Sequence, residues 1–225
     1  ALAIARSGGF DVTVVMSHLA SADDPRAEQN EAQRASFERL AGLFPHVARS
    51  LANSGGVFLG KPYHFDLTRP GIALYGGEAA LDPLCALRPV ATLHARILQV
   101  HTAPRGEAAG YGAAARLERA TRIATIGLGY ADGFPRSASG DAAHRATRPA
   151  PEMLVGGHRA PVLGRISMDL TLLDVTDLPE DAAQPGAVVE VFGAHMSLDE
   201  TAQRCGTIAY ELLTSLGSRV RRFAV

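Results

Sequence analysis

Lysine is almost absent from this sequence, and two other residue types are scarce. Among its 225 residues there is one lysine, Lys61, no tryptophan and two cysteines, Cys85 and Cys205. A reaction that needs a lysine amine therefore has a single candidate here. The cysteines form neither a CxxC motif nor the spacing of a metal site. They indicate two reduced thiols, which is typical of a cytoplasmic protein.

Long apolar runs and an excess of charge are also missing. The sequence has 22 basic and 23 acidic side chains, so its net charge is −1. This balance gives no electrostatic footprint for nucleic acid or an anionic membrane. No apolar run approaches the roughly 20 residues that span a bilayer, and no secretory signal is visible. The length suits one large or two modest domains.

The first 86 residues alternate between short apolar runs and amphipathic segments. The predicted elements are the end of a helix over 1–9, strands over 12–16 and 47–52, and between these strands a helix that starts near Asp23-Asp24-Pro25. This helix carries an apolar stripe of Phe37, Leu40, Leu43, Phe44 and Val47. A glycine-rich turn over 53–56, a short helix at 57–59 and a βα-type turn at 69–71, framed by 65–69 and 72–75, follow. Such alternation implies parallel strands joined by crossovers. It predicts the last units of a βα barrel, since a whole barrel needs roughly 250 residues.

The pattern changes after residue 86 and becomes mainly β. The predicted elements are strands over 91–101, 122–128, 153–155, 160–166, 170–175, 187–192 and 220–225, a hairpin turn at Gly156-Gly157, helices over 197–204 and 208–216, and a mobile loop over 136–152. Serine at the start of the first helix and two acids in its first turn suit a helix N-terminus. We therefore expect a second, mainly β domain over 87–225.

Several short motifs share one order and spacing along the chain. They are Ser17-His18-Leu19-Ala20, Asn53-Ser54-Gly55, Arg69-Pro70-Gly71-Ile72-Ala73-Leu74-Tyr75-Gly76, Gly129-Tyr130-Ala131-Asp132-Gly133-Phe134-Pro135-Arg136, Gly164-Arg165-Ile166-Ser167-Met168-Asp169 and Ala209-Tyr210-Glu211. In this arrangement the chain resembles the alanine racemases over nearly its whole length. The third and fourth motifs are highly specific together, whereas either alone is moderate evidence.

The resemblance implies a fold, an activity and partners. It implies an N-terminal TIM-type βα barrel that binds pyridoxal 5'-phosphate, here as residues 1–86, followed by the C-terminal β domain. It implies an isomerase that interconverts L-alanine and D-alanine, with D-alanine feeding peptidoglycan synthesis in the bacterial cytoplasm. It also implies a homodimer in which each active site borrows residues from the other copy's β domain.

Four residues are assigned by the resemblance to the phosphate of the cofactor. They are Ser54, Gly71, Ile72 and Tyr210. Barrel enzymes often bind phosphate at the loops after their last strands, and main-chain amides at a helix start suit an anion. Taken without the surrounding motifs, Asn-Ser-Gly-Gly and Arg-Pro-Gly are more simply read as plain turns.

Arg69 matches the arginine that the family places against the nitrogen of the cofactor ring. A guanidinium is effectively always charged and only donates hydrogen bonds, so it leaves that nitrogen unprotonated. The ring is then a weaker electron sink, which favours a short-lived intermediate and suppresses side reactions. An isolated Arg-Pro pair carries no such implication by itself.

Three further residues complete the predicted site. Tyr130 matches the tyrosine that acts as a base from the second subunit, and it needs help because a free tyrosine holds its proton up to a pH of about 10. His18 resembles the histidine that links this tyrosine to the ring arginine, which also places it beside the cofactor. Met168 resembles the residue whose amide meets the substrate carboxylate. Without the motifs, His18 is a satisfied polar residue, and Tyr130 and Met168 are core side chains.

The family's cofactor lysine has no match in this sequence. It lies well upstream of the matched motifs, and Lys61 occupies a predicted solvated loop. We therefore expect this chain, which begins without methionine, to be part of a longer protein and inactive alone. The alternatives are a racemase of another small amino acid such as serine, a related decarboxylase, or a non-catalytic remnant of the fold. The Tyr130 motif favours racemases over decarboxylases, whereas small substrates are hard to separate by sequence.

Overall fold

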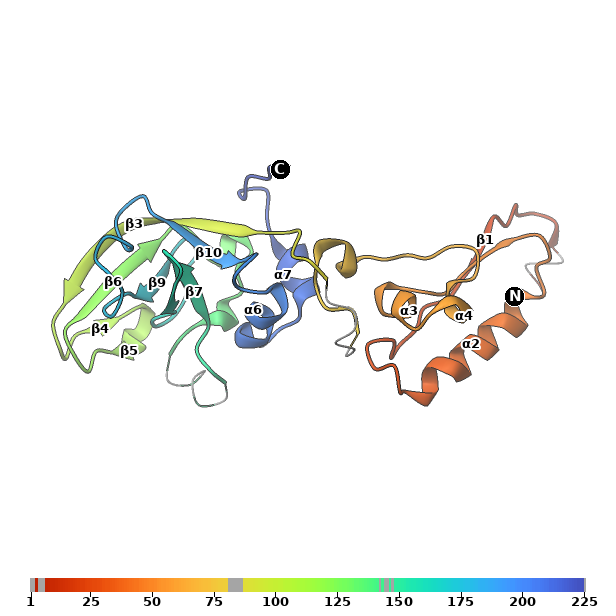
Figure 1. Cartoon of the computed structure of the whole chain (residues 1–225), viewed down its shortest axis with the longest axis horizontal. Coiled ribbons are helices and arrows are strands. Elements are labelled where there is room, and N and C mark those ends of the chain that lie inside the picture. The colour runs from red at the N-terminus through yellow and green to blue at the C-terminus, as the bar shows by residue number, and fades with distance from the viewer. Residues whose placement is uncertain are drawn as a thin grey trace. The chain divides into compact units, whose positions relative to one another are not determined.

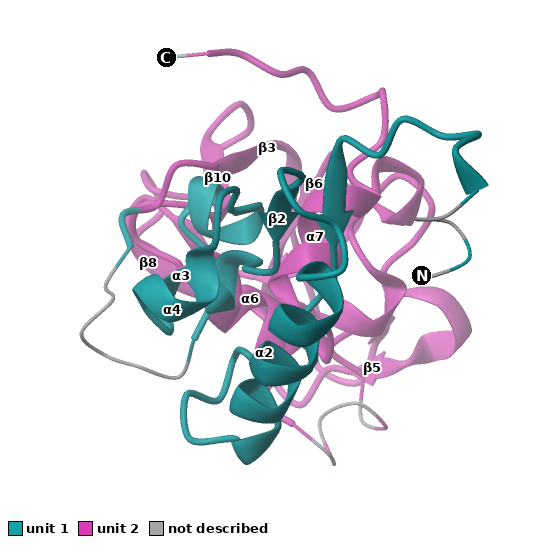
Figure 2. Ribbon diagram, turned by 90° about the vertical axis from the view of Figure 1, so that its right-hand side faces the viewer, with its two compact units in different colours: residues 1–88 teal, residues 89–225 magenta. Residues whose placement is uncertain are grey.

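The computed structural model consists of two compact units, residues 1–88 and 89–225 (Figures 1 and 2). It describes residues 3, 7–80, 87–141, 143, 146 and 148–224. Most of the helix predicted over 1–9 lies outside the described residues, as do Cys85 and the last residues before the predicted domain boundary. Among the described residues, no helix has the length and apolar character needed to cross a bilayer.

The first unit is built on two parallel strands joined by a helix. β1 (Val14–Met16) pairs in parallel with β2 (Ala48–Ser50), and α2 (Glu28–Ala41) lies between them in the sequence. A small core of Leu19, Ala22, Phe37, Ala41 and Leu51 lies at its centre. Both predicted strands and the predicted helix are confirmed.

The apolar stripe of α2 is narrower than predicted. Phe37 is buried and meets Phe65 edge to face at 5.0 Å between ring centroids. Leu40 and Leu43 are 47% and 38% exposed. The helix also begins later than predicted, at Glu28 and not near Pro25. The side chain of Asp24 instead closes a separate turn, in which it accepts from the amide of Arg26 at 3.0 Å.

Two predicted features of the first unit are wrong. The turn over 53–56 is the start of α3 (Ser54–Phe58), because Asn53 caps this helix by accepting from the amide of Gly56. The segment 72–75, which follows the predicted βα-type turn at 69–71, is a 3₁₀ helix, η1 (Ile72–Tyr75), and ends at Gly76 in a left-handed conformation. Lys61 opens the short helix α4 (Lys61–His64) and is exposed, so its predicted loop is a helix.

The second unit contains a six-stranded antiparallel sheet in the order β8-β7-β10-β3-β6-β9. Its strands are β3 (Leu93–Ala103), β6 (Thr121–Ile126), β7 (Glu152–Val155), β8 (His158–Pro161), β9 (Thr171–Asp174) and β10 (Val188–Phe192). A separate hairpin pairs β4 (Ala108–Ala109) with β5 (Ala115–Arg116). A bridge between Val162 and Leu173 brings the chain after β8 onto β9, so the two edges of the sheet meet.

Two helices and several tight turns complete this unit. α6 (Leu198–Cys205) begins at Ser197, whose hydroxyl accepts from the amide of Glu200, and α7 (Ala209–Ser215) follows. Gly156 and Gly157 both have positive φ and join β7 to β8 as predicted. Short 3₁₀ turns occur at η3 (Tyr111–Ala113), η4 (Tyr130–Asp132) and η5 (Arg136–Ala138). Six of the seven predicted strands, the hairpin turn and the two helices are thus confirmed, with shifted ends.

Two predictions for the second unit fail. Residues 220–224 form no strand, because the Arg222 guanidinium instead bonds the carbonyls of Leu216, Gly217 and Val220. The segment 136–141, predicted to open a mobile loop, is packed. Ser139 is 1% exposed, and its hydroxyl accepts from the amide of Ile166 at 3.1 Å.

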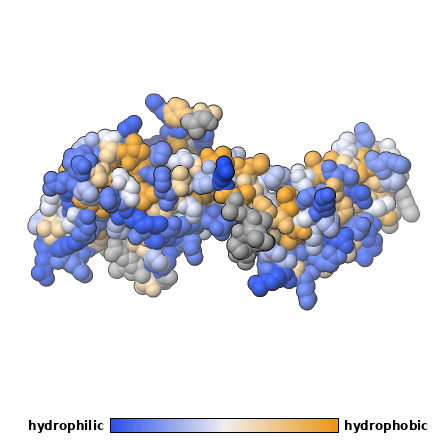
Figure 3. Space-filling view, viewed as in Figure 1, coloured by the Kyte–Doolittle hydropathy of each residue, from blue (hydrophilic) through white to orange (hydrophobic). Residues whose placement is uncertain are grey.

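The fold class is therefore seen only in coarse form. The described residues show one parallel strand pair in the first unit and an antiparallel sheet in the second, so a TIM barrel is not seen directly. Apolar patches interrupt the polar surface over both units in the view of Figure 3. Exposed apolar side chains include Val14 and Met16 of β1, which are 41% and 62% exposed.

Candidate functional site

In the first unit, Arg69 is fixed by groups at the ends of both strands. Its Nη2 donates to the main-chain oxygen of Ser17 at 2.7 Å, just after β1, and its Nη1 donates to the hydroxyl of Ser50, the last residue of β2. Ser50 is fully buried and donates in turn to the carbonyl of Leu67 at 2.7 Å. The Nε–H of Arg69 is bonded to no group within the described residues. Of the five N–H groups of the guanidinium, the Nε–H and one Nη1–H therefore remain available to a bound acceptor.

Ser54 connects α3 with the turn before η1. It is 2% exposed, and its hydroxyl accepts from the amides of Gly71 and Ala73 at 2.8 Å and 3.4 Å. No acceptor for the hydroxyl proton of Ser54 occurs among the residues that the structure describes. Because a buried donor normally has a partner, this proton is available to a bound acceptor. Beside Gly71 the space is open, since a Cβ there would meet no atom within 4 Å.

His18 is joined to this group through its contact with Asn53. The Nδ2 of Asn53 is 3.1 Å from Nε2 of His18. Asn53 directly precedes Ser54, and Ser17 directly precedes His18. The structure thus brings His18, Ser54, Arg69, Gly71 and Ile72 into one connected group within the first unit.

In the second unit, Tyr130 and Met168 lie on two turns that are bonded together. The amide of Tyr130 donates to the carbonyl of Ser167 at 3.1 Å, and that of Ala131 donates to the carbonyl of Met168 at 2.9 Å. Tyr130 is 42% exposed and Met168 is 53% exposed. These exposures exclude the alternative that Tyr130 and Met168 are core side chains.

Asp132 and Arg219 hold the Tyr130 turn in place. The Asp132 side chain accepts from the amide of Gly129 at 2.9 Å and lies 3.2 Å from Nε of Arg219. Arg219 also donates to Asp169 at 2.8 Å, in the turn after Met168. The hydrogen bond to Asp169, together with the charge of Asp132, raises the pKa of the Arg219 guanidinium. One cation therefore ties both turns together.

Tyr210 lies on a helix and not on either of these two turns. It is the second residue of α7 and is 46% exposed, and its carbonyl accepts from the hydroxyl of Thr214 at 2.8 Å. Helix α7 carries Tyr210, whereas Tyr130 and Met168 lie on turns. The structure thus divides the predicted residues into a connected group in the first unit, a pair of turns in the second, and Tyr210.

Sequence reasoning missed the residues that support this group. Ser50, Asn53, Asp132 and Arg219 hold the candidate residues through hydrogen bonds or ion pairs. Asn53 could have been found as a helix cap, because asparagine before a short polar and glycine-rich start is a usual N-cap. Ser50 and Arg219 carry no sequence signal, because their partners are 19 and 50 or more residues away in the chain.

The chain is similar to alanine racemases in both halves. Residues 90–224 match the family described as "Alanine racemase, C-terminal domain", and residues 1–79 match "Alanine racemase, N-terminal domain". It is 51% identical over 220 residues to an alanine racemase of Rhizobium meliloti (strain 1021), and 48% identical over 226 residues to a biosynthetic one of Agrobacterium fabrum. These alignments cover 97% of this chain in both cases, but 58% and 56% of the relatives. The chain thus spans little more than half the length of these relatives.

Solved structures agree with this similarity. The biosynthetic alanine racemase of Pseudomonas aeruginosa is 41% identical with a TM-score of 0.84, over 100% of this chain and 61% of that one. The Bartonella henselae enzyme, solved with covalently bound pyridoxal phosphate, is 37% identical with a TM-score of 0.84, over 96% of this chain and 57% of that one. Because one family description matches more than half of the sequence, the chain belongs to the alanine racemase family.

Proposed function

We propose that this chain forms part of a pyridoxal-phosphate-dependent racemase that interconverts L-alanine and D-alanine. The observation that carries the proposal is the first unit's group of donors. Arg69 is held by the ends of two parallel strands with its Nε–H unused, and the buried Ser54 hydroxyl has a proton without an acceptor among the described residues. The family membership supports the same reaction and a cytoplasmic supply of D-alanine for peptidoglycan.

The residues present fit the cofactor chemically. Pyridoxal phosphate carries an anionic phosphate and an aromatic nitrogen that accepts a hydrogen bond. Ser54, with the main-chain groups of Gly71 and Ile72, would hold the phosphate, and Tyr210 would join them through its phenol. Arg69 would face the ring nitrogen, since a guanidinium offers several donors in a fixed plane and no acceptor.

When bound, the cofactor delocalises negative charge that develops on the α-carbon of the amino acid. Arg69 limits this effect, because it donates a hydrogen bond but keeps its own proton. Ser50 and the carbonyl of Ser17 fix the guanidinium plane and so set the direction of its Nε–H. We expect fewer side reactions as a result, because weaker withdrawal of electrons shortens the lifetime of the carbanion.

Inversion of a stereocentre needs proton transfer on both faces of the α-carbon. We propose Tyr130 for one face, acting on the site of a second copy in a homodimer, with Met168 placing the substrate carboxylate through its main-chain amide. The exposure of both side chains supports this role, because a residue that serves another chain must lie at the surface. His18 would contact the phenol of Tyr130 from the receiving copy.

The other proton-transfer group is a lysine that this chain does not supply. Lys61 is exposed at the start of α4, and no hydrogen bond or ion pair joins it to Arg69 or Ser54 among the described residues. We propose that the lysine belongs to the rest of a βα barrel, of which β1 and β2 are two strands. Barrel strands are covered on both faces, and the exposed Val14 and Met16 of β1 are side chains that such a barrel would cover.

The test begins with the native protein. Its intact mass and N-terminal sequence are measured, and it is then treated with pyridoxal phosphate and borohydride and mapped by peptide mass. The expected result is a longer polypeptide with the cofactor on a lysine upstream of these residues, and conversion of L-alanine to D-alanine. L-serine serves as the competing substrate. Absence of both the cofactor adduct and D-alanine formation would overturn the proposal.

A matched pair of variants tests the site itself. Arg69→Lys keeps the charge but loses the planar fork, and Arg26→Lys makes the same change at an exposed arginine in the same unit. The expected result is at least a tenfold loss of kcat in Arg69→Lys and wild-type kinetics in Arg26→Lys. Equal activity of the two variants would remove Arg69 from the site.

A further inference from the structure

The amide of Asn53 makes hydrogen bonds in two directions. Its Oδ1 accepts from the main-chain amide of Gly56 at 2.9 Å and so caps α3. Its Nδ2 lies 3.1 Å from Nε2 of His18 and 3.5 Å from the carbonyl oxygen of Leu19. One side chain thus joins the start of the helix that carries Ser54 to the imidazole of His18.

These partners fix which end of the amide is oxygen and which is nitrogen. The Gly56 N–H can only donate, so the atom that faces it is the oxygen. The carbonyl of Leu19 can only accept, so the atom near it is the NH₂ group. That NH₂ group donates to Nε2 of His18, which must therefore present a lone pair. With this contact in place, the ring proton of His18 is on Nδ1.

A residue of α2 holds the main chain around His18 through separate hydrogen bonds. The side chain of Gln33 donates to the carbonyl of His18 at 3.3 Å and accepts from the amide of Ala20 at 3.0 Å. His18 is thus held in two places, at its main chain by Gln33 and at its Nε2 by Asn53. Its orientation follows from two residues outside the predicted set of site residues.

We propose that Asn53 is a positioning residue that selects the Nδ1–H tautomer of His18. Free neutral histidine in water favours the opposite form, with the proton on Nε2, so the selection is a property of this fold. The Nε2 of His18 is thus occupied by Asn53, so the structure does not show the direct link from His18 to Arg69 that the resemblance implied. The guanidinium of Arg69 is instead bonded to Ser17 and Ser50.

The consequence for chemistry rests on the proposed function. With Nε2 occupied, His18 has only Nδ1–H to offer, and that group is a donor. A donor that meets the phenol of Tyr130 from a second copy stabilises its ionised oxygen, which is the form that removes a proton. Asn53 would therefore influence the base of the reaction while it contacts neither substrate nor cofactor ring.

Nuclear magnetic resonance of the ring nitrogens measures the tautomer directly. The 225-residue chain is labelled with ¹⁵N-histidine, and two-bond ¹H–¹⁵N correlations are recorded at pH 8 without cofactor or alanine. His18 is assigned by its loss in His18→Gln. We expect its Nδ1 in the range of a protonated ring nitrogen and its Nε2 in the range of an unprotonated one. His64 is an internal reference, because its Nε2 lies 2.9 Å from the carbonyl of Val57 and must carry the proton.

Two variants of Asn53 separate the tautomer from the helix cap. Asn53→Asp keeps an acceptor for Gly56 but replaces the donor with a second acceptor, and Asn53→Ser keeps a capping hydroxyl that is too short to reach His18. Both are expected to move the proton of His18 to Nε2 and to leave the His64 pattern unchanged, which also shows that α3 is intact.

Three outcomes would overturn the proposal. They are a wild-type His18 with its proton on Nε2, a His18 pattern unchanged in both variants, and a His64 pattern that changes together with that of His18. Because no cofactor or substrate is present, a failure of the racemase assignment leaves this measurement valid. Conversely, a negative tautomer result leaves the racemase assay untouched.

Discussion

Gly129 lies so close to Met168 that a Cβ on the glycine would come within 2.3 Å of the methionine's carbonyl oxygen. This contact joins the turn that presents Tyr130 to the turn that presents Met168. Three hydrogen bonds surround it, from the amides of Gly129, Tyr130 and Ala131. The two turns therefore behave as one structural feature.

The first prediction concerns this close approach. Gly129→Ala should lower the free energy of unfolding by about 3 kcal/mol, because the methyl group forces backbone atoms apart. Gly127→Ala is the matched control, since its Cβ would lie 3.4 Å from a methyl group of Leu98, which is ordinary contact. Urea denaturation of both variants measures the difference. Similar stabilities for the two would show that the turns can separate without cost.

The second prediction concerns the two carboxylates that share Arg219. Asp132 is 8% exposed and also accepts from the amide of Gly129, whereas the side chain of Asp169 is 54% exposed. Asp132→Asn should therefore destabilise the protein by about 1–3 kcal/mol, because it weakens a buried, charge-assisted arrangement. Asp169→Asn should cost no more than about 0.5 kcal/mol, as is usual for an exposed ion pair.

Urea denaturation at pH 7 in low and high salt tests this difference. Added salt should reduce the effect of Asp169→Asn and leave that of Asp132→Asn nearly unchanged, since exposed charges are screened more strongly. If Asp169→Asn lowered the free energy of unfolding more than Asp132→Asn, Arg219 would hold the turns through Asp169 and not through Asp132.

The second unit could be predicted largely from the sequence because its signals are local. Side chains of β3 alternate between buried and exposed over its first six residues, which is the period of a half-buried strand. Ser197 caps α6 within three residues of its own position. The glycines at 156 and 157 supply the positive φ values of a tight hairpin. Each of these signals is complete within a few residues.

The failures arise where the deciding contact is distant in sequence. The segment 136–141 is rich in small and polar residues, as a mobile loop is, but the Ser139 hydroxyl accepts from the amide of Ile166, 27 positions away. The candidate residues were predicted from motifs, whereas the partners that orient them were not. Ser50 meets Arg69 across 19 positions, and Asn53 meets His18 across 35. Only the folded chain brings these pairs together.

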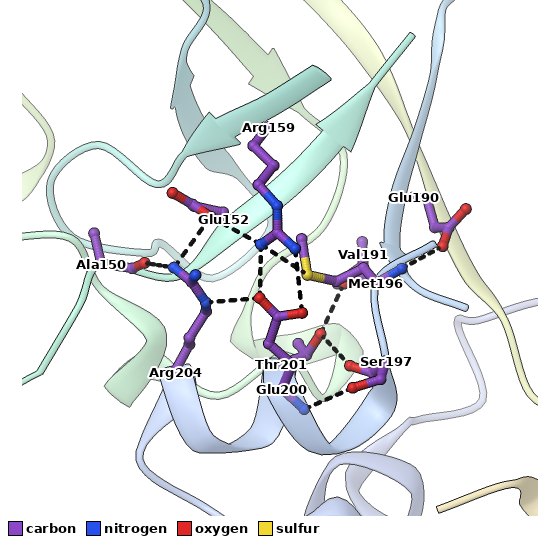
Figure 4. A network of polar contacts seen from close by, with 10 residues as sticks. All are labelled: Ala150, Glu152, Arg159, Glu190, Val191, Met196, Ser197, Glu200, Thr201 and Arg204. Atoms are coloured by element: carbon purple, nitrogen blue, oxygen red, sulfur yellow. Dashed lines mark hydrogen bonds and ion pairs between the residues drawn. The ribbon is translucent and has the colours of Figure 1, made fainter. Parts of the chain in front are cut away.

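The third prediction concerns the ion-pair network that joins α6 to β7 and β8 (Figure 4). Arg159 lies between Glu152 and Glu200, at 3.0 Å and 2.6 Å, and Arg204 contacts the same two carboxylates at 3.1 Å. The hydrogen bond from Arg159 lowers the pKa of the Glu200 carboxyl. A lowered pKa in the folded state means that ionised Glu200 stabilises the fold above its unfolded pKa of about 4.3.

This stabilisation should disappear as the pH falls through the lowered folded-state pKa of Glu200. Glu200→Gln is expected to cost about 1 kcal/mol at pH 7, and this cost should shrink as the pH falls below about 4, because the carboxyl becomes protonated. The control is Glu180→Gln, at an exposed carboxylate that has no ion pair among the described residues. Thermal unfolding between pH 2 and 8 gives the difference. A cost that stays constant with pH would mean that packing, and not charge, is lost.

The last prediction concerns the thiol of Cys205, which is fully buried at the end of α6. Burial raises the pKa of this thiol to about 12. Because only the thiolate reacts, its population at pH 8 should be smaller than that of a free cysteine by a factor on the order of 1000. In a Cys85→Ser background, labelling with a disulfide reagent should therefore be limited by opening of the fold.

A control isolates burial from the chemistry of the reagent. Ser218→Cys, in the same background, adds a thiol at an exposed position, which should react at once. In 8 M urea both thiols should react at the same rate, since unfolding removes the burial that separates them. Fast labelling of Cys205 in the native chain would mean that α6 opens readily. In that case the network of Arg159 and Arg204 does not hold this helix against the sheet.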